Sequence, residues 1–256
     1  MPCGKCYACK LKKANDWQIR LKQEYLNNGE RCIFVTLTYE DDRIPQIDGC
    51  GVVSRRDIQL FHKRLRHDVG SFTYFLVAEY GPTTLRPHYH GLYFGLDLSA
   101  QKYITKHWHN GFNTVSLVTP GRIQYVAKYS LIPISIPDKL LNLAKPFMIC
   151  SKGIGIQYLQ NPAVHRMHNI DDKLYYNDNG YKKSLPRYYR QKLFSEEKRK
   201  QFAEDYRKRS HQQKLELHKL MIDNPREFQK LLKRKKDWVY SHSYDVENRI
   251  LKKPKL

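Results

Sequence analysis

The sequence predicts a domain of the α+β class, preceded by a cysteine-bearing helix and followed by a basic helical tail. Three segments rich in β-branched and aromatic residues predict strands, at residues 32–39, 72–80 and 89–95. The last two are separated by residues 81–87, a short connection that contains glycine and proline. These two strands should therefore form a hairpin or a pair joined by a short loop. A further strand is expected over residues 113–118.

Two helices are predicted in the first quarter of the chain. Residues 8–27 carry apolar side chains three and four positions apart, and Asn28-Gly29 follows as a stop signal. Ser54 and Asp57 resemble the N-terminal cap of a second helix. The apolar face of that helix consists of Ile58, Phe61 and Leu65.

The composition favours a polyanionic partner. The 256-residue chain has 46 Lys and Arg against 25 Asp and Glu, a formal net charge of +21. Such a surplus favours phosphate contacts with release of counterions. The chain also has 19 Tyr and 10 Phe, side chains that stack on bases. Nucleic acid is therefore the leading candidate, and a merely soluble basic protein is the alternative.

The compartment is predicted from what the sequence lacks and from its cysteines. It contains no apolar run long enough to span a bilayer, no lipidation signal and no secretory leader, so no membrane partner is expected. Three of the six cysteines are scattered, at Cys32, Cys50 and Cys150, which is unlike a disulfide framework. We expect a cytosolic protein with reduced thiols.

The other three cysteines form the pattern Cys3-x-x-Cys6-x-x-Cys9, which could bind zinc. Zinc sites usually have four ligands, so the fourth would come from a scattered cysteine or from a histidine. The alternative is a set of free thiols.

The chain is predicted to have three parts: the cysteine cluster and first helix in residues 1–30, the main domain in residues 31–189 and the basic tail in residues 190–256. The tail contains 20 Lys and Arg against 10 Asp and Glu and has little apolar periodicity. It is either a solvated charged face or an arm that contacts DNA or a partner.

Two histidines, His88 and His90, are separated by one residue in a predicted strand. Because side chains alternate along a strand, both histidines must project from the same face. Such a pair can bind a divalent metal, although histidine is also common as a half-buried strand residue. Glu79 ends the preceding strand and is a candidate third ligand, or else a surface glutamate. A mixed nitrogen and oxygen set suits Mg²⁺ or Mn²⁺.

A third helix is predicted after Thr119-Pro120, which supply an N-cap and a proline at the first helical position. It is expected over residues 122–131, since prolines follow. It carries Tyr125, Lys128 and Tyr129. The two tyrosines are four residues apart, so both phenol oxygens can point into one pocket. Paired tyrosines are more often packing residues, but Lys128 could favour a phenolate or stabilise charge on a phosphoryl oxygen.

Together the two motifs predict one reaction. A metal held by the histidines would act as a Lewis acid on a phosphodiester, and Tyr125 or Tyr129 would attack it. The resulting phosphotyrosyl bond keeps the energy of the broken linkage, so the strand can be rejoined without ATP.

Three ordered segments resemble the motifs of rolling-circle replication initiators of the HUH endonuclease superfamily: residues 34–39, 86–91 and 125–129. Four further segments resemble, more narrowly, the replication initiation proteins of gokushovirus-like microviruses: residues 2–6, 78–81, 151–155 and 185–189. The resemblance implies an antiparallel sheet, with the histidines on a central strand and the tyrosine helix packed across it.

The resemblance also implies a function. Such enzymes nick one strand of the phage replicative form at the origin, stay attached to the 5′ phosphate, and later rejoin the strand to release circular single-stranded DNA. The free 3′ hydroxyl primes a host polymerase, and in initiators with two tyrosines, which Tyr125 and Tyr129 match, the two alternate. The implied partners are origin DNA, single-stranded or nicked, with a host helicase and polymerase in the bacterial cytoplasm.

Two other classes remain alternatives at the level of sequence. One is a related transposase or relaxase that applies the same chemistry to different DNA. The other is a non-catalytic basic DNA-binding protein in which the histidines and tyrosines are structural.

Overall fold

The computed structural model describes residues 3–4, 6–129 and 136–237, apart from the side chains of Tyr7 and Tyr129. The chain divides into two compact units, the first ending at Leu193 and the second beginning at Phe194. Each unit is described by itself, and the predicted division into three parts stays a prediction.

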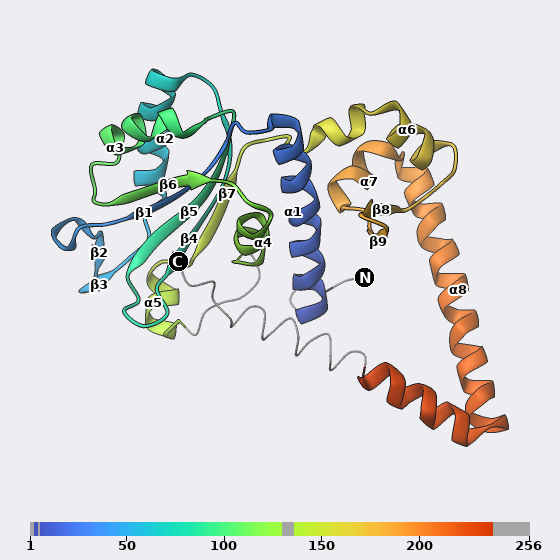
Figure 1. Ribbon diagram of the computed structural model, residues 1–256. Coiled ribbons are helices and arrows are strands. Elements are labelled where there is room, and N and C mark those ends of the chain that lie inside the picture. The colour runs from blue at the N-terminus through green and yellow to red at the C-terminus, as the bar shows by residue number, and fades with distance from the viewer. Residues whose placement is uncertain (1–2, 5, 130–135, 238–256) are drawn as a thin grey trace. The chain divides into compact units, whose positions relative to one another are not determined.

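A five-stranded sheet forms the centre of the first unit (Figure 1). All neighbouring strands are antiparallel, which confirms the predicted α+β class. In spatial order the strands are β6 (Asn113–Leu117), β1 (Cys32–Thr38), β5 (Pro87–Phe94), β4 (Thr73–Tyr80) and β7 (Phe147–Cys150). Strand β5, which carries both histidines, is therefore central.

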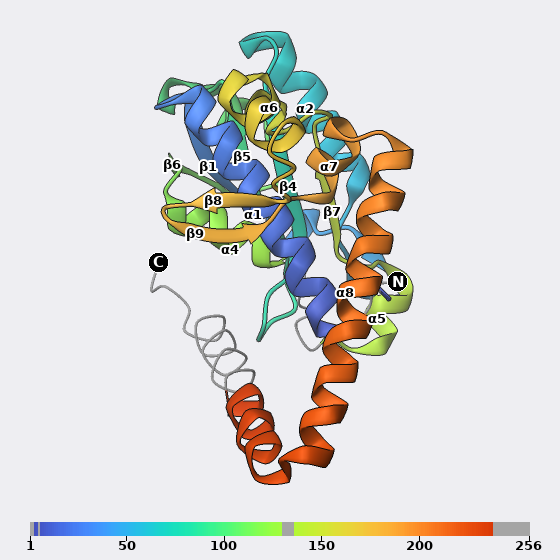
Figure 2. The same cartoon turned by 90° about the vertical axis from the view of Figure 1, so that its right-hand side faces the viewer.

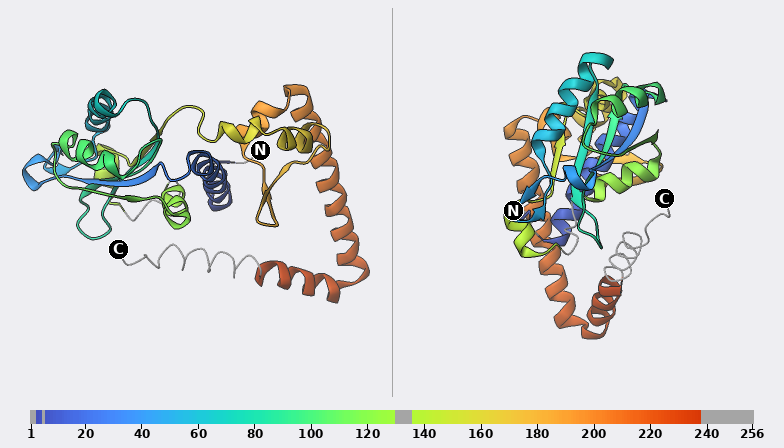
Figure 3. Two further views of the ribbon diagram at one scale, coloured as in Figure 1. Left: turned by 45° about the horizontal axis from the view of Figure 1, so that its top comes forward. Right: turned by 90° about the vertical axis from the view of Figure 1, so that its left-hand side faces the viewer.

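Helices cover both faces of the sheet (Figure 3). One face packs against α2 (Arg55–Val69) and α3 (Gln101–His107), around a buried core that includes Tyr89 and Tyr93 of β5. The opposite face packs against α1 (Tyr7–Asn28) and α4 (Pro120–Tyr129). Because side chains alternate along β5, this second face is also the one on which His88 and His90 lie.

Local capping sets the helix boundaries much as the sequence predicts. The Ser54 hydroxyl accepts a hydrogen bond from the backbone N–H of Asp57 at the start of α2. The Thr119 hydroxyl accepts one from the backbone N–H of Arg122 in the first turn of α4. Helix α1 ends at Asn28, where Gly29 adopts a φ of 57°. The predicted continuation of α4 through residues 130–131 lies outside the described residues.

Strand β5 begins at Pro87, two residues earlier than predicted, so it includes both histidines. Proline is tolerated as the first residue of a strand, because its missing N–H is not needed there. Pro87 pairs with Tyr80, and the connection shortens to residues 81–86.

Several short elements were not predicted. They are η1 (Asp41–Arg43), β2 (Gln46–Ile47), β3 (Cys50–Gly51), η2 (Leu98–Ala100), α3, α5 (Asp138–Leu143), β7, η3 (Ile156–Gln160), α6 (Pro162–Asn169), β8 (Tyr175–Asp178), β9 (Tyr181–Ser184) and α7 (Arg187–Leu193). Most have too few residues for a periodic apolar pattern to appear.

Helix α1 is joined to several segments of the first unit. The buried carboxylate of Glu24 accepts hydrogen bonds from the Thr73 hydroxyl and the Gly155 backbone N–H, at 3.0 and 2.8 Å. The β8–β9 hairpin also lies against α1 (Figure 2), where Lys22 donates to the Asp178 carboxylate at 2.5 Å. These bonds fix the helix against the sheet.

The second unit is helical, as predicted for the tail. It contains α8 (Glu196–Asp223), in which no residue is buried, and a further helix over residues 225–237. Among the described residues, no helix is both long and apolar enough to cross a membrane.

Candidate active site

The register of the sheet brings Glu79, His88 and His90 together. Glu79 of β4 lies directly opposite His88 of β5, so the two side chains share a face. The Glu79 Oε1 atom is 3.3 Å from Nε2 of His90 and 3.6 Å from Nε2 of His88. One ligand atom from each residue fits within a group whose members are all within 4.8 Å of one another.

Hydrogen bonds to the other ring nitrogens orient both imidazoles. Nδ1 of His88 donates to the Arg86 carbonyl oxygen at 3.0 Å, and Nδ1 of His90 lies 3.0 Å from the Thr36 hydroxyl. Each Nε2 atom is thereby turned toward Glu79. Metal-binding histidines are commonly held in this way, with one nitrogen facing the ion and the other bonded to the protein.

The Glu79 carboxyl group is buried, with 5% of the residue exposed. Neither of its oxygens forms a hydrogen bond within the part of the chain that the structure describes. Burial raises the pKa of Glu79 to about 8. Burial, with a smaller effect of the His88 charge, lowers the pKa of His90 to about 3. A buried carboxyl group without hydrogen bonds, beside two imidazoles that each turn Nε2 toward it, fits a divalent cation.

Tyr125 projects from α4 toward this group. Its phenol oxygen is 3.4 Å from Nε2 of His90, and the two rings meet edge to face with centroids 5.4 Å apart. Ile123, Val126 and Ala127 are buried in the core between α4 and the sheet, so packing fixes the direction in which Tyr125 points. The phenol of Tyr125, a group that can act as a nucleophile, therefore lies beside the candidate metal ligands.

The other two predicted residues of α4 are described less fully. Lys128 is half-buried and follows Tyr125 by almost one helical turn. Tyr129 is the last residue of α4, and its side chain lies outside the described part of the structure.

The N-terminal thiols also lie together. Sγ of Cys3 is 3.9 Å from Sγ of Cys9, and the Cys6 backbone N–H donates to Sγ of Cys3 at 3.2 Å. The three sulfur atoms are within 4.8 Å of one another. Among the described residues, this group does not include the three scattered cysteines, Cys32, Cys50 and Cys150.

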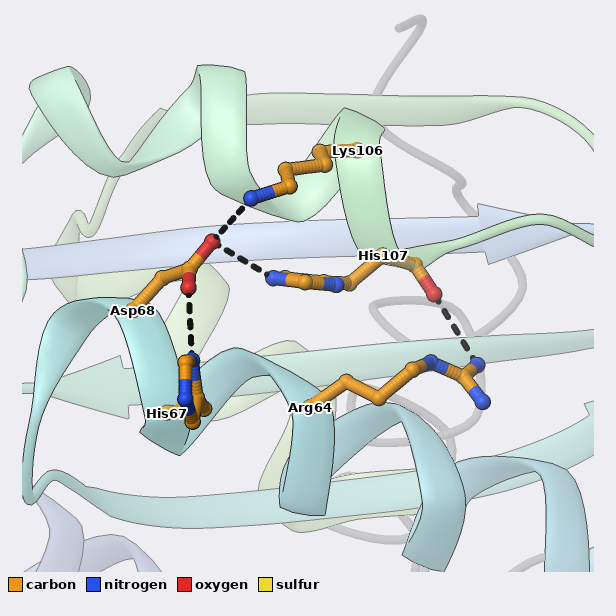
Figure 4. Close-up of polar contacts among 5 residues, drawn as sticks. All are labelled: Arg64, His67, Asp68, Lys106 and His107. Atoms are coloured by element: carbon orange, nitrogen blue, oxygen red, sulfur yellow. Dashed lines mark hydrogen bonds and ion pairs between the residues drawn. The ribbon is translucent and has the colours of Figure 1, made fainter.

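A different cluster of charged residues lies on the opposite side of the sheet (Figure 4). The Asp68 carboxylate accepts hydrogen bonds from Lys106 and His107 of α3, at 2.7 and 2.9 Å, and these bonds with one from His67 hold its pKa below the usual range. Arg64 donates to the His107 carbonyl oxygen. The cluster joins α2 to α3, and we assign it a structural role.

Sequence reasoning missed the role of Thr36. Thr36 lies in residues 34–39, which resemble a family motif, but its contact with His90 depends on the pairing of β1 with β5. A search for polar residues at even spacing along β1 could have found it, because alternate side chains share a face.

A family model, "Replication-associated protein ORF2/G2P", matches residues 32–131, which contain Glu79, both histidines and Tyr125. Replication-associated protein ORF2 of Spiroplasma virus 4 is 30% identical over 217 residues, covering 75% of this chain and 67% of that protein. Replication-associated protein ORF4 of Chlamydia phage 1 is 23% identical over 228 residues, covering 77% of this chain and 55% of that protein. Replication-associated protein VP4 of Bdellovibrio phage phiMH2K is 30% identical over 149 residues, covering 50% of this chain and 47% of that protein.

The sheet and the matched segment define a phage replication-associated protein. More particularly, the chain belongs to the ORF2/G2P family of replication-associated proteins, in the microvirus group. It spans about half the length of the Chlamydia and Bdellovibrio phage proteins. No solved structure matches the chain.

Proposed function

We propose that this chain initiates rolling-circle replication by nicking one strand of the phage replicative form at the origin, through a 5′-phosphotyrosine intermediate. The observation that carries the proposal is the placement of the Tyr125 phenol 3.4 Å from His90, beside the buried carboxyl of Glu79. Family membership supports the replicative role and favours it over a transposase or relaxase.

Glu79, His88 and His90 would hold one Mg²⁺ or Mn²⁺ ion. The donor set supports this assignment, because two imidazole nitrogens and a carboxylate oxygen suit Mn²⁺, while Mg²⁺ is the more available ion. Such an ion, when bound, supplies Lewis-acid activation of a phosphodiester. Thr36 and the Arg86 carbonyl act as positioning groups, since they hold the two rings in the ligand orientation.

Tyr125 would be the nucleophile. Its phenol loses a proton and the oxygen attacks the scissile phosphorus, while the bond from phosphorus to the 3′ oxygen breaks and that oxygen takes up a proton. The 5′ phosphate remains on the tyrosine. In the reverse step a 3′ hydroxyl attacks the phosphorus of the phosphotyrosine, the bond from phosphorus to the tyrosine oxygen breaks, and the phenol regains its proton. This rejoins the strand and releases circular single-stranded DNA.

Lys128 and Tyr129 are assigned supporting roles. The ammonium group of Lys128 would favour the phenolate or stabilise charge on the phosphoryl oxygens. Tyr129 follows Tyr125 by four residues on α4, a spacing that supports a second nucleophile on the same helix face. Alternation of the two tyrosines would let one hold the parental 5′ end while the other cleaves the regenerated origin.

The partners follow from the chemistry. The formal charge of +21 supports binding to single-stranded and nicked origin DNA. The 3′ hydroxyl released at the nick would prime a host polymerase, and a host helicase would separate the strands, in the cytoplasm of the bacterial host.

We also propose a zinc site at Cys3, Cys6 and Cys9. The approach of three sulfur atoms within 4.8 Å supports it, because thiolates are the preferred ligands of structural zinc. The hydrogen bond from the Cys6 N–H to Sγ of Cys3 would further stabilise a thiolate there.

The test of the nicking proposal is covalent adduct formation. Labelled single-stranded oligonucleotides that tile a microvirus genome are incubated with the full chain and Mn²⁺, then separated under denaturing conditions. We expect one segment to give a labelled protein band that is absent with chelator and with His88→Ala or His90→Ala. Absence of the band across the whole genome contradicts the proposal. A His88→Ala variant that forms the adduct as well as wild type would contradict the role of His88 as a metal ligand. A wild type that binds DNA but gives no adduct would instead favour a non-catalytic DNA-binding protein.

A further inference from the structure

Phe112 is an exposed aromatic residue directly before β6, an edge strand of the sheet, with 65% of its surface open to solvent. Single exposed apolar side chains are common on protein surfaces, so it is the position of Phe112 relative to the candidate site that carries the argument. Phe112 lies in the segment that the family model matches, but outside the histidine and tyrosine motifs.

The register places Phe112 on the same face as the candidate metal ligands. Thr36 pairs with both His90 and Thr114, so these three side chains share a face. The Thr38 N–H donates to the Phe112 carbonyl oxygen at 2.9 Å, which extends the pairing of β1 with β6 by one residue. Since Phe112 precedes Thr114 by two positions, it projects from that same face.

A row of side chains therefore crosses the sheet at one level. Thr38 pairs with His88, and His88 pairs with Glu79, so the row runs from Phe112 through Thr38 and His88 to Glu79. Two strand spacings separate Phe112 from His88, about 10 Å. At this distance, Phe112 can contact the base of a nucleotide whose neighbouring phosphate is bound at the histidines.

The backbone that carries Phe112 is held firmly. The Glu40 N–H donates to the Asn110 carbonyl oxygen at 2.8 Å, and the Trp108 indole donates to the Thr38 carbonyl oxygen at 2.9 Å. A Cβ atom at Gly111 would lie 2.4 Å from the Glu40 nitrogen, so the segment runs directly against the end of β1. The position of the Phe112 backbone is thus set by the sheet, which reduces the ordering needed when the ring binds.

Two arginines lie on segments that adjoin this edge of the sheet. The Arg122 guanidinium lies 5.2 Å from the ring centroid of Phe34, which pairs with Ser116 further along β6. Arg43 donates to the His109 carbonyl oxygen, in the segment that leads to Phe112. A backbone phosphate beside the stacked base would meet the Arg122 guanidinium, whereas Arg43 is already paired with the Glu40 carboxylate.

We propose that Phe112 is the stacking platform for an unpaired DNA base beside the scissile phosphate. The proposal rests on the proposed nicking function and adds a positioning residue to it: the stacked base fixes the register of the single strand across the sheet. In duplex DNA every base is already stacked on its neighbours and cannot stack on Phe112. The contact therefore favours origin DNA whose strands have separated.

Binding is measured without cleavage, by fluorescence anisotropy of a labelled dT20 strand and of a 20-base-pair duplex, in chelator. Stacking on one aromatic ring predicts that Phe112→Ala raises the Kd for dT20 roughly 5-fold to 150-fold and leaves the duplex Kd within twofold. Phe112→Trp should bind dT20 at least as tightly as wild type. The matched control is Leu117→Ala, which removes an exposed apolar residue of β6 whose partner Ile33 belongs to the opposite core; it should bind like wild type.

A second readout locates the contact. Irradiation of wild type with 5-iodouracil-substituted dT20 should cross-link the peptide that contains Phe112. The proposal is overturned if Phe112→Ala binds dT20 within twofold of wild type, or if it weakens single-stranded and duplex DNA equally. Failure of the nicking proposal is distinguishable, because it appears as a missing covalent adduct in Mn²⁺ while these binding constants remain measurable.

Discussion

The phenol oxygen of Tyr125 lies 3.4 Å from Nε2 of His90, although the two residues are on different elements and 35 positions apart in the sequence. Buried residues of α4 pack against the sheet beneath them and hold this approach. The phenol and the three candidate ligands are therefore already assembled. Pre-assembly of this kind reduces the entropy lost on reaching the transition state.

The raised pKa of Glu79 predicts a pH-dependent stability for the metal-free chain. Because its folded pKa of about 8 exceeds the ordinary value of 4.5, folding favours the protonated carboxyl. The stabilisation is complete below pH 4.5 and is lost as the pH rises through 8. His90, with a pKa lowered to about 3, acts oppositely, but only below about pH 6.5. Between pH 6.5 and 8, the free energy of unfolding should fall by about 2 kcal/mol relative to Glu79→Gln.

Urea unfolding in chelator at several pH values measures this difference. Glu79→Gln is the matched reference, since it keeps the shape of the side chain and removes the titration. Parallel pH profiles of the two proteins would show that the Glu79 carboxyl is not destabilised by burial.

Thr36→Val should weaken metal binding without removing a ligand. Valine keeps the shape of threonine but cannot bond to Nδ1 of His90, so the ring loses its orienting partner. Loss of such a hydrogen-bond partner lowers metal affinity by roughly 10- to 100-fold. Isothermal titration with Mn²⁺ measures the effect. Thr114→Val, an exposed residue on the same face, should bind Mn²⁺ like wild type, and equal affinities for all three proteins would refute the assigned role of Thr36.

Gly155→Ala should destabilise the first unit. Gly155 has a φ of 75°, and an added Cβ would lie 2.6 Å from the Arg20 carbonyl oxygen and 2.7 Å from the Tyr189 hydroxyl. Backbone strain and steric overlap together should lower the free energy of unfolding by about 2–4 kcal/mol.

Gly153→Ala is the control for this substitution. Gly153 has a similar φ of 80°, but an added Cβ would meet no atom within 4 Å. Gly153→Ala should therefore lower the free energy of unfolding only by the strain of a positive φ, about 1 kcal/mol. Equal shifts of the urea midpoint in the two variants would mean that the close approach of α1 at Gly155 is unimportant.

The 256-residue chain, purified under reducing conditions, should contain about one zinc ion per molecule at the N-terminal thiols. Elemental analysis should show that Cys6→Ser loses this zinc, whereas Cys50→Ser retains it. Replacement by Co²⁺ should give the charge-transfer absorption of thiolate ligands. A zinc-free wild-type protein would contradict the proposed site.

Local patterns in the sequence explain which parts of the site could be predicted. The shared face of His88 and His90 follows from strand periodicity alone, and the caps at Ser54 and Thr119 are encoded within four residues. Glu79 could be assigned to the end of its strand. Its position directly opposite His88 depends on strand register, which the sequence does not show.

Long-range pairing explains most of what could not be predicted. Strand β7 has four residues and pairs with β4, about 70 positions earlier in the chain. The Asp68 cluster depends on the packing of α2 against α3. The exposed position of Phe112 follows from the pairing of β6 with β1, because nothing local distinguishes it from a core aromatic.

The most direct test of the central claim identifies the amino acid that is joined to DNA. The wild-type adduct formed in Mn²⁺ is digested with protease and nuclease, and the modified peptide is sequenced by mass spectrometry. Tyr181→Phe, which removes an exposed phenol of β9, serves as the control and should form the adduct normally. We predict a 5′-nucleotide on Tyr125, and loss of at least about a thousandfold in the rate of the first cleavage for Tyr125→Phe, with dT20 binding unchanged. An adduct that forms at the wild-type rate in Tyr125→Phe, or a 5′-nucleotide found on a residue outside α4, would contradict the account.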